Sequence, residues 1–256
     1  MSYPTQLDIA RGLARGLTAG RQFGRNSAVG ATFVPIANGG IYRTPQPAGA
    51  TRLRIAAGNA ADSPAGAGAR SIRIRGLNAS GEAVEETLST NGASAGPAST
   101  HSYLRLYAAY VETSGTYATQ TAGSHVGTIT IQNEAGTETW ATITDGAQPR
   151  GEAQIGVISV PARRQLYITD LTIAADAEKK ISIKLYQRRN ILQAAAPYSA
   201  LRVVEEYASI GGLFELHYAA PLGPFPPLTD IGFMAAISAS TADVSAAFDY
   251  FLETIP

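Results

Sequence analysis

Three histidines are the first candidates for chemistry in this chain. His101, His125 and His217 could each ligate a metal ion or act as a general base, since imidazole does both. They lie far apart in the sequence, and none belongs to a His-x-x-x-His pair of the kind that binds zinc. We therefore interpret all three as surface or half-buried structural histidines.

Two pairs of adjacent glutamates could supply the carboxylates that glycoside hydrolysis requires. The pairs are Glu85-Glu86 and Glu205-Glu206, and both lie in stretches that alternate like strands. Adjacent side chains on a strand point to opposite faces, so neither pair converges on one substrate by itself.

The remaining ligand-binding motifs are incomplete. The Gly-Ala-Gly run at 66–68 lacks the third glycine and the Lys-Ser/Thr that a phosphate loop requires. Asp145, Asp176, Asp230 and Asp243 are scattered, with no Asp-x-Asp-x-Asp pattern for calcium. The absence of cysteine excludes disulfides, thiolate zinc sites and cysteine nucleophiles. We predict no catalytic, metal or cofactor site, and a protein that is not an enzyme.

Aromatic side chains keep a glycan-binding function open as an alternative. The chain has twelve tyrosines and one tryptophan, and such rings can stack on sugars. Tyr103 and Tyr107 would share one face of a strand, whereas Tyr110 falls on the other. Packing in a core or a subunit interface is the default interpretation of these rings.

Arginines and glycines interleave at the start of the chain. Glycine recurs every fourth residue from Gly12 to Gly24, and each one costs a helix about 1 kcal/mol relative to alanine. Residues 1–30 are therefore predicted to be an extended arm or a short helical turn that docks on another surface, with a flexible basic tail as the alternative. The predicted docking residues are Arg11, Arg15, Arg21, Phe23, Arg25 and Asn26.

The charges are distributed unevenly along the chain. Through Arg75 there are ten arginines and two acids, and from Gly76 onward ten basic residues face eighteen acids. This asymmetry predicts that the first part docks on something acidic, such as a copy of itself, another protein or nucleic acid. A protein partner is favoured over nucleic acid, because no basic module with interleaved aromatic residues is present.

From about residue 31 the sequence alternates with a period of two, which is typical of half-buried antiparallel strands. The stretches 71–75 and 82–88 flank a turn and are predicted to form a hairpin. Arginines occupy the polar faces of the early strands, where we expect a subunit interface. These interface residues are Arg52, Arg54, Arg73 and Arg75. Further strands are predicted at 52–55, 103–111, 126–132, 140–143, 155–160, 165–173, 180–186, 202–207, 212–218, 231–238 and 244–252.

Short strands at near-regular spacing predict an all-β protein with one or two antiparallel β-sandwich domains, of jelly-roll or immunoglobulin-like type, preceded by the extended arm. A turn-rich stretch at 145–152 suggests a boundary. The predicted division is an arm at 1–30, a sandwich at 31–148 and a second sandwich at 149–256. The two halves echo each other weakly, so a duplication is one hypothesis. No apolar run is long enough to span a membrane as a helix, and no secretion signal opens the chain.

Several short motifs, in order along nearly the whole chain, resemble a family of tailed-bacteriophage structural proteins known mostly from short-tailed phages and prophages. The motifs are the stretches 10–12, 23–26, 65–70, 75–81, 85–88, 226–231 and 242–249. One departure is the turn at 160–164, Val-Pro-Ala-Arg-Arg, where the family pattern would have a glycine and a lysine.

The resemblance implies a non-enzymatic component of the virion, assembled in the host cytoplasm. It implies a decoration or cement protein of the head, which binds the major capsid protein or other virion proteins as a homo-oligomer, with a trimer favoured. Several linked copies would bind a repeating shell with high avidity. A collar or tail protein that anchors a fibre, and a module that recognises a host glycan receptor, are the alternatives.

Overall fold

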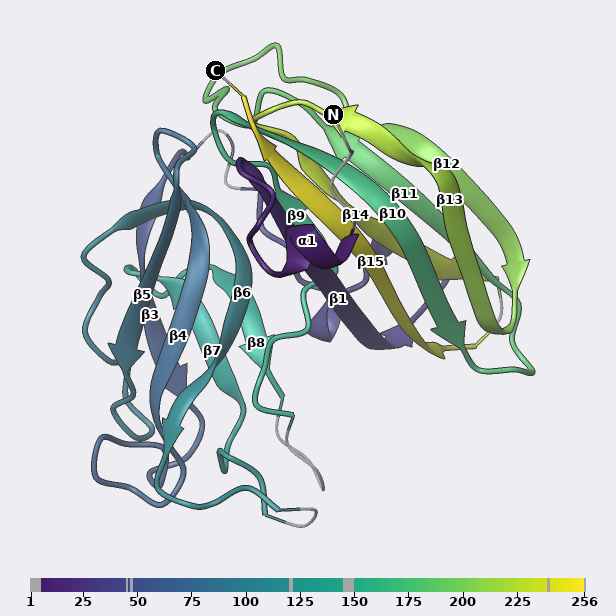
Figure 1. Cartoon of the computed structure of the whole chain (residues 1–256). Helices are drawn as coiled ribbons and strands as arrows, with labels where there is room; N and C mark the ends of the chain where they lie inside the picture. The colour runs from purple at the N-terminus through teal and green to yellow at the C-terminus, as the bar shows by residue number, and fades with distance from the viewer. Residues whose placement is uncertain are drawn as a thin grey trace. The chain divides into compact units, whose positions relative to one another are not determined.

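The protein is almost entirely β, which confirms the predicted fold class. The computed structural model describes residues 6–44, 46, 48–119, 122–144, 150–238 and 240–255. One short helix precedes the strands (Figure 1). The elements are α1 (Gln6–Ala10), β1 (Leu17–Val29), β2 (Val34–Pro35), η1 (Asn38–Gly40), β3 (Thr51–Ala57), β4 (Ala69–Asn78), β5 (Ala83–Ser89), β6 (Ser102–Ser114), β7 (Ile129–Asn133), β8 (Thr139–Ile143), β9 (Val157–Ser159), β10 (Arg164–Ala175), β11 (Ile181–Arg188), β12 (Arg202–Ile210), β13 (Gly212–Phe225), β14 (Asp230–Ile237) and β15 (Ala242–Thr254).

The chain divides into two compact units, and the division differs from the predicted one. Unit 1 comprises Met1–Ile36, Gly156–Ile191 and Tyr198–Pro256, and unit 2 comprises Ala37–Ile155 with Leu192–Pro197. The predicted arm at 1–30 belongs to unit 1, and the predicted boundary at 148–149 lies outside the described residues. Strand pairing between distant parts of the chain causes the difference, because a linear scan for turns does not detect it.

Unit 1 has the strand order of a jelly roll. Sheet A has the order β1-β15-β10-β13, and sheet B has the order β12-β11-β14-β2, with β9 also pairing β14. The antiparallel pairs β1–β15, β2–β14, β10–β13 and β11–β12 are nested one inside another along the chain. Eight strands nested in this way form the two Greek keys of a jelly roll.

Strand β1 corrects the prediction that residues 1–30 form an arm docking on another surface, because it pairs within the chain's own sheet. Its residues pair with β15 from Leu17 opposite Glu253 to Asn26 opposite Val244. The residues Gln22, Gly24 and Asn26 are buried. The inward face of β1 is thus polar or small rather than apolar, so the alternation that identifies other strands is absent here.

The chain leaves unit 1 and returns to it at one point. The amide of Gly156 donates to the carbonyl of Ile36 at 2.9 Å, and everything between these residues belongs to unit 2. β2 precedes this point and β9 follows it, and both pair with the same strand, β14. Unit 2 is therefore an insertion between two short strands that share one neighbour.

The core of unit 1 consists of aliphatic and aromatic side chains from both sheets. Phe248 of β15 and Phe233 of β14 meet edge to face, with ring centroids 5.8 Å apart. Fully buried isoleucines and leucines from β10 and β11 fill the space around them, which is where alternation predicts the apolar face. These isoleucines and leucines are Leu166, Ile168, Leu171, Ile173, Ile181, Ile183 and Leu185.

Unit 2 contains a six-stranded arrangement with the order β5-β4-β6-β3-β7-β8. The predicted hairpin is confirmed: β4 pairs with β5 around a turn in which the Gly81 amide donates to the Asn78 carbonyl. Strand β3 pairs with β6 through its first two residues and with β7 through the next five. The two units have different strand orders, so the echo between the halves does not reflect a duplicated fold.

Gly24→Ala should lower the free energy of unfolding by about 2 to 3 kcal/mol, because overpacking against backbone cannot be relieved by a side-chain rotation. A Cβ at Gly24 would overlap the Ile36 carbonyl and the backbone of Gly156. Gly30→Ala is the matched control, since nothing lies within 4 Å of that Cβ. Chemical denaturation measures both variants, and equal stability of the two would contradict the proposed close approach.

Deleting residues 1–30 should abolish the cooperative thermal transition of unit 1, because β15 loses a whole neighbouring strand. Deleting residues 1–13 should keep the transition, since only α1 and the following turn are lost. Calorimetry detects the transition, and hydrogen exchange reports on the amides of β15. If β15 stays protected without residues 1–30, β1 is not part of the sheet in solution.

Candidate functional site

The outward face of β1 carries three of the predicted docking residues. Arg21, Phe23 and Arg25 alternate with buried neighbours and face solvent, and Phe23 is 36% exposed. Asn26 lies on the inward face and is only 4% exposed. Its Oδ1 accepts from the Ala28 amide at 3.0 Å, so the structure places this predicted docking residue inside the fold and not on the outward face.

Four ionisable side chains form a row across the outer face of sheet A. Arg21 lies opposite Asp249, Asp249 opposite Asp170, and Asp170 opposite His217. Arg21 Nη1 donates to both oxygens of Asp249 at 3.0 and 3.1 Å, and His217 Nδ1 lies 2.5 Å from Asp170 Oδ1. Like charges directly opposite each other destabilise a sheet. Here Arg21 lies beside Asp249 and His217 lies beside Asp170, so each aspartate has a basic neighbour.

The contacts within this row lower the pKa of Asp170. Burial raises the pKa of Asp170, but hydrogen bonds from His217 and Thr169 outweigh burial and leave the pKa below its ordinary value. The carboxylate is therefore charged wherever an ordinary aspartate is charged.

A second ion pair lies further along the same two strands. Arg25 donates to Asp243 through two nitrogens, and this hydrogen bonding raises the pKa of Arg25. Asp176 accepts from the amide of Asp243 and pairs with Lys179 at 3.1 Å. Arg21 and Arg25, predicted to anchor a partner, thus each neutralise an aspartate of the chain's own last strand.

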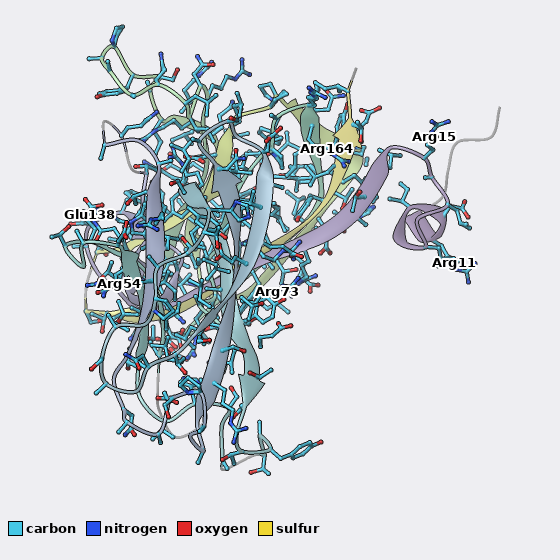
Figure 2. All side chains as sticks on the ribbon, turned by 90° about the vertical axis from the view of Figure 1, so that its left-hand side faces the viewer. Arg11, Arg15, Arg54, Arg73, Glu138 and Arg164 are labelled. Carbon is cyan, nitrogen blue, oxygen red and sulfur yellow. The ribbon has the colours of Figure 1, made fainter. Side chains whose placement is uncertain are left out.

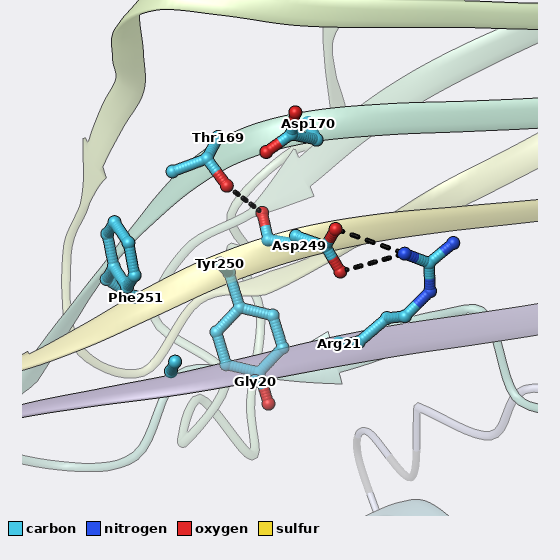
Figure 3. A pocket seen from close by; sticks show the side chains of 8 residues that line it. Gly20, Arg21, Thr169, Asp170, Asp249, Tyr250 and Phe251 are labelled. Carbon is cyan, nitrogen blue, oxygen red and sulfur yellow. Dashed lines mark hydrogen bonds and ion pairs between the residues drawn. The ribbon is translucent and has the colours of Figure 1, made fainter. Parts of the chain in front are cut away.

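A hollow of about 410 Å³ lies beside the row that begins with Arg21 and Asp249 (Figure 3). Arg21, Asp170 and Asp249 line it on the polar side, and Ala19 and Phe251 line it on the apolar side. Thr169 donates to the carbonyl of Asp249 at 3.3 Å. Both lining carboxylates already have partners, Arg21 for Asp249 and His217 for Asp170.

The N-terminal arginines differ from Arg21 and Arg25. Arg11 and Arg15 are exposed, and no ion pair links either one to another described residue. They lie on the segment that precedes β1 (Figure 2). These two are the arginines of the predicted docking set that have no ion-pair partner among the described residues.

The four strand arginines of unit 2 make most of their contacts within the unit. Arg52 forms a bidentate pair with Glu134, and Arg73 pairs with Glu85 at 2.5 Å and with Glu112 at 3.5 Å. Arg75 Nε lies 3.5 Å from Glu85. These pairs supply the acidic contacts that we expected from neighbouring subunits, so the interface function of these residues stays a prediction.

Arg54 is the fourth of these arginines, and its Nε is buried without a hydrogen-bond partner among the described residues. Its guanidinium packs against Gly136 in the turn after β7. Figure 2 labels Arg54, Arg73 and Glu138 on this unit.

The candidate chemical groups of the sequence do not converge. His125 is buried, with Nε2 3.0 Å from the Thr144 carbonyl, and His217 pairs with Asp170. Glu86 accepts from the amides of Thr100 and His101, and therefore orders a loop. No group of three metal-ligating side chains occurs within the part of the chain that the structure describes.

Glu205 accepts hydrogen bonds from the hydroxyls of Tyr207 and Tyr218 at the open edge between β12 and β13. Burial raises the pKa of Tyr207 to about 12, and the bond to Glu205 adds to the shift. Burial and the same carboxylate raise the pKa of Tyr218 further. A carboxylate held by two neutral phenols therefore links β12 to β13 at this edge.

Sequence reasoning missed one structural carboxylate. Asp62 is fully buried and accepts from the amides of Ala69, Val126 and Gly127 at 2.8 to 3.0 Å. It ties three loops of unit 2 together. One feature of the sequence could have indicated it: Asp62 is one of only two acidic residues in the first 75.

The two tyrosines that would share a strand face are not exposed as a platform. Tyr103 is fully buried, and burial raises its pKa; Tyr107 is half-buried.

Among the residues described, no helix is long and apolar enough to cross a membrane.

Comparisons with known proteins leave the family open. No family model matches the chain, and no curated protein matches it. The chain is similar to one from the structure of infectious bursal disease virus Gt strain, with 11% identity, a TM-score of 0.25, and 94% of this chain and 73% of that chain covered. It is also similar to one from the T13 particle of the same virus, with 10% identity, a TM-score of 0.21, and 93% and 74% covered. TM-scores this low carry no argument about fold or function.

His217→Ala should raise the pKa of Asp170, because burial would then be less opposed. A lowered folded pKa contributes stability above the ordinary aspartate pKa, and this stability is lost as the pH falls through the folded value. The variant should therefore lose stability at neutral pH and show a weaker acid dependence. Carbon-13 NMR of the Asp170 carboxyl measures the pKa, with His101→Ala as the control. An unchanged Asp170 pKa would show that the row does not exist in solution.

Proposed function

We propose that this chain is a non-enzymatic structural protein of a virus particle. The observation that carries the proposal is the jelly roll of unit 1, which holds a second β unit within one of its connections. Jelly rolls occur in viral capsid and lectin domains, and also in cupins, so the fold by itself does not identify a function. The sequence resemblance to tailed-bacteriophage structural proteins supports the virion among these.

Within the virion, we place the protein on the head as a decoration or cement protein that contacts the major capsid protein. A homo-oligomer, with a trimer favoured, suits this position, because several linked copies raise the effective concentration of each binding surface. Of the four arginines predicted to dock, Arg11 and Arg15 are available, since Arg21 and Arg25 are engaged within the sheet.

A collar or tail position is the second candidate, because the same exposed arginines could bind any acidic virion protein. The glycan-receptor module receives less support, since Tyr103 and Tyr107 form no exposed platform.

Electron microscopy of intact particles with a gold-labelled antibody against this protein tests the proposal. Label over the whole head is the expected result for a decoration protein, and label at one vertex or on the tail would favour the second candidate. Particles that carry no label, although the same antibody detects the protein in infected cells, would overturn the virion function.

A further inference from the structure

One end of unit 1 gathers arginines from distant parts of the chain. The start of β10 and the start of β1 both lie at the end of β15, since Arg164 is opposite Thr254 and Leu17 is opposite Glu253. Backbone bonds fix the adjoining turns: Thr254 donates to Gly16, and Ile255 donates to Arg163. Arg15, Arg163 and Arg164 therefore belong to one end of sheet A. Figure 2 labels Arg15 and Arg164.

Sheet B brings two more arginines to the same end. Ser159, which the turn at 160–163 connects to β10, lies opposite Asp230, and Asp230 lies opposite Arg188 at the end of β11. The next pair, Gln187 with Arg202, begins β12. Arg189 and Arg202 thus flank the loop between β11 and β12, at the end of unit 1 where Figure 1 labels the C-terminus. We call the set Arg15, Arg163, Arg164, Arg189 and Arg202 the arginine end.

The arginine end is not neutralised within the chain. None of its five members forms an ion pair with a described residue, and only Arg189 has a side-chain hydrogen bond, to Gln187 at 3.4 Å. The nearby acids are occupied: Asp230 is buried and accepts from Ser159, and Glu253 accepts from Gln165 and Tyr167. Arginines elsewhere, such as Arg21 and Arg52, do have carboxylate partners. Like charges gathered without partners repel each other, and an acidic ligand would relieve this repulsion.

Apolar side chains accompany these arginines. Tyr198, Leu201 and Val203 are 41%, 37% and 46% exposed in the loop before β12 and at its start, and Leu13 is 70% exposed two residues before Arg15. Arginine and tyrosine are enriched at the centres of protein interfaces. A phosphate backbone would satisfy the charges but leave the apolar groups in water, so this composition favours a protein.

Arg163 adds an observation from the backbone. Its φ is 59°, in the left-handed region that favours glycine, within the turn that Arg164 closes by donating to Pro161 at 3.2 Å. Residues in sparsely populated backbone regions cluster at functional sites, and Arg163 is the one arginine of the described chain in this region.

We propose that the arginine end docks an acidic protein surface that also offers apolar or aromatic contacts. The identity of the partner, a virion protein, rests on the proposed function. The chemistry of the surface does not depend on it. It replaces the predicted linear arm with a surface assembled by the fold.

Binding of the full chain to three fluorescent probes tests the chemistry directly. The probes are poly-L-glutamate, a glutamate–tyrosine copolymer and a DNA duplex, each presented at equal charge. We expect the copolymer to bind most tightly, and R163E/R202E to weaken its binding by about tenfold or more. R150E/K180E is the matched control, since it makes the same charge change at exposed residues outside the arginine end. Tightest binding to DNA, or equal losses in the two double variants, would overturn the proposal.

Arg163→Gly separates binding from stability. Glycine relieves the left-handed backbone, so the midpoint of thermal unfolding should stay the same or rise, while copolymer binding weakens. A variant that binds as the wild type does would remove Arg163 from the surface. If these variants unfold, the single variants Arg202→Glu and Arg164→Glu are compared with the wild type for copolymer binding instead.

Incorporation into particles distinguishes the two proposals. If the wild-type protein is absent from particles while the copolymer result holds, the virion function fails and the acidic-protein surface stands. If R163E/R202E enters particles as efficiently as R150E/K180E does, the arginine end is not the docking surface even though the virion function stands.

Discussion

The pairing of the first long strand with the last one is the constraint on which unit 1 depends. β1 and β15 are joined in register from Leu17 with Glu253 to Asn26 with Val244, and this is the outermost of the nested pairs. A jelly roll closes only when its ends meet, so the other pairs lie inside this one. The same pairing aligns Arg21 with Asp249 and places the turn before β1 beside the end of β15.

Nesting also explains how a second β unit fits within the chain. Each inner pair of strands is complete without the segment that connects it to the next, so a connection can be long. Ile36 and Gly156 are hydrogen-bonded neighbours, and the insertion therefore imposes no separation on the strands that flank it. The small residue at Gly24 is needed where these backbones meet.

Folding largely cancels the charge asymmetry of the sequence. Unit 1 contains twelve Lys and Arg against eleven Asp and Glu, and unit 2 contains eight against nine. Ion pairs across β1 and β15 and across β4 and β5 account for part of the cancellation. What remains is local: arginines without partners gather at one end of unit 1, where loops distant in sequence converge. Net charge along the chain therefore did not distinguish arginines that pair within the sheet, such as Arg21 and Arg25, from arginines without an ion-pair partner among the described residues.

The sequence by itself determined the all-β class and most strands, including the hairpin of β4 and β5, because apolar alternation and turn residues act locally. It did not reveal β1, whose inward residues Gln22, Gly24 and Asn26 carry no apolar signal. Only the tertiary structure decided that strand, the insertion of unit 2 and the gathering of Arg163 with Arg202. The physical reason is that these features depend on which distant segments pair, and the period of a single strand contains no information about its partner.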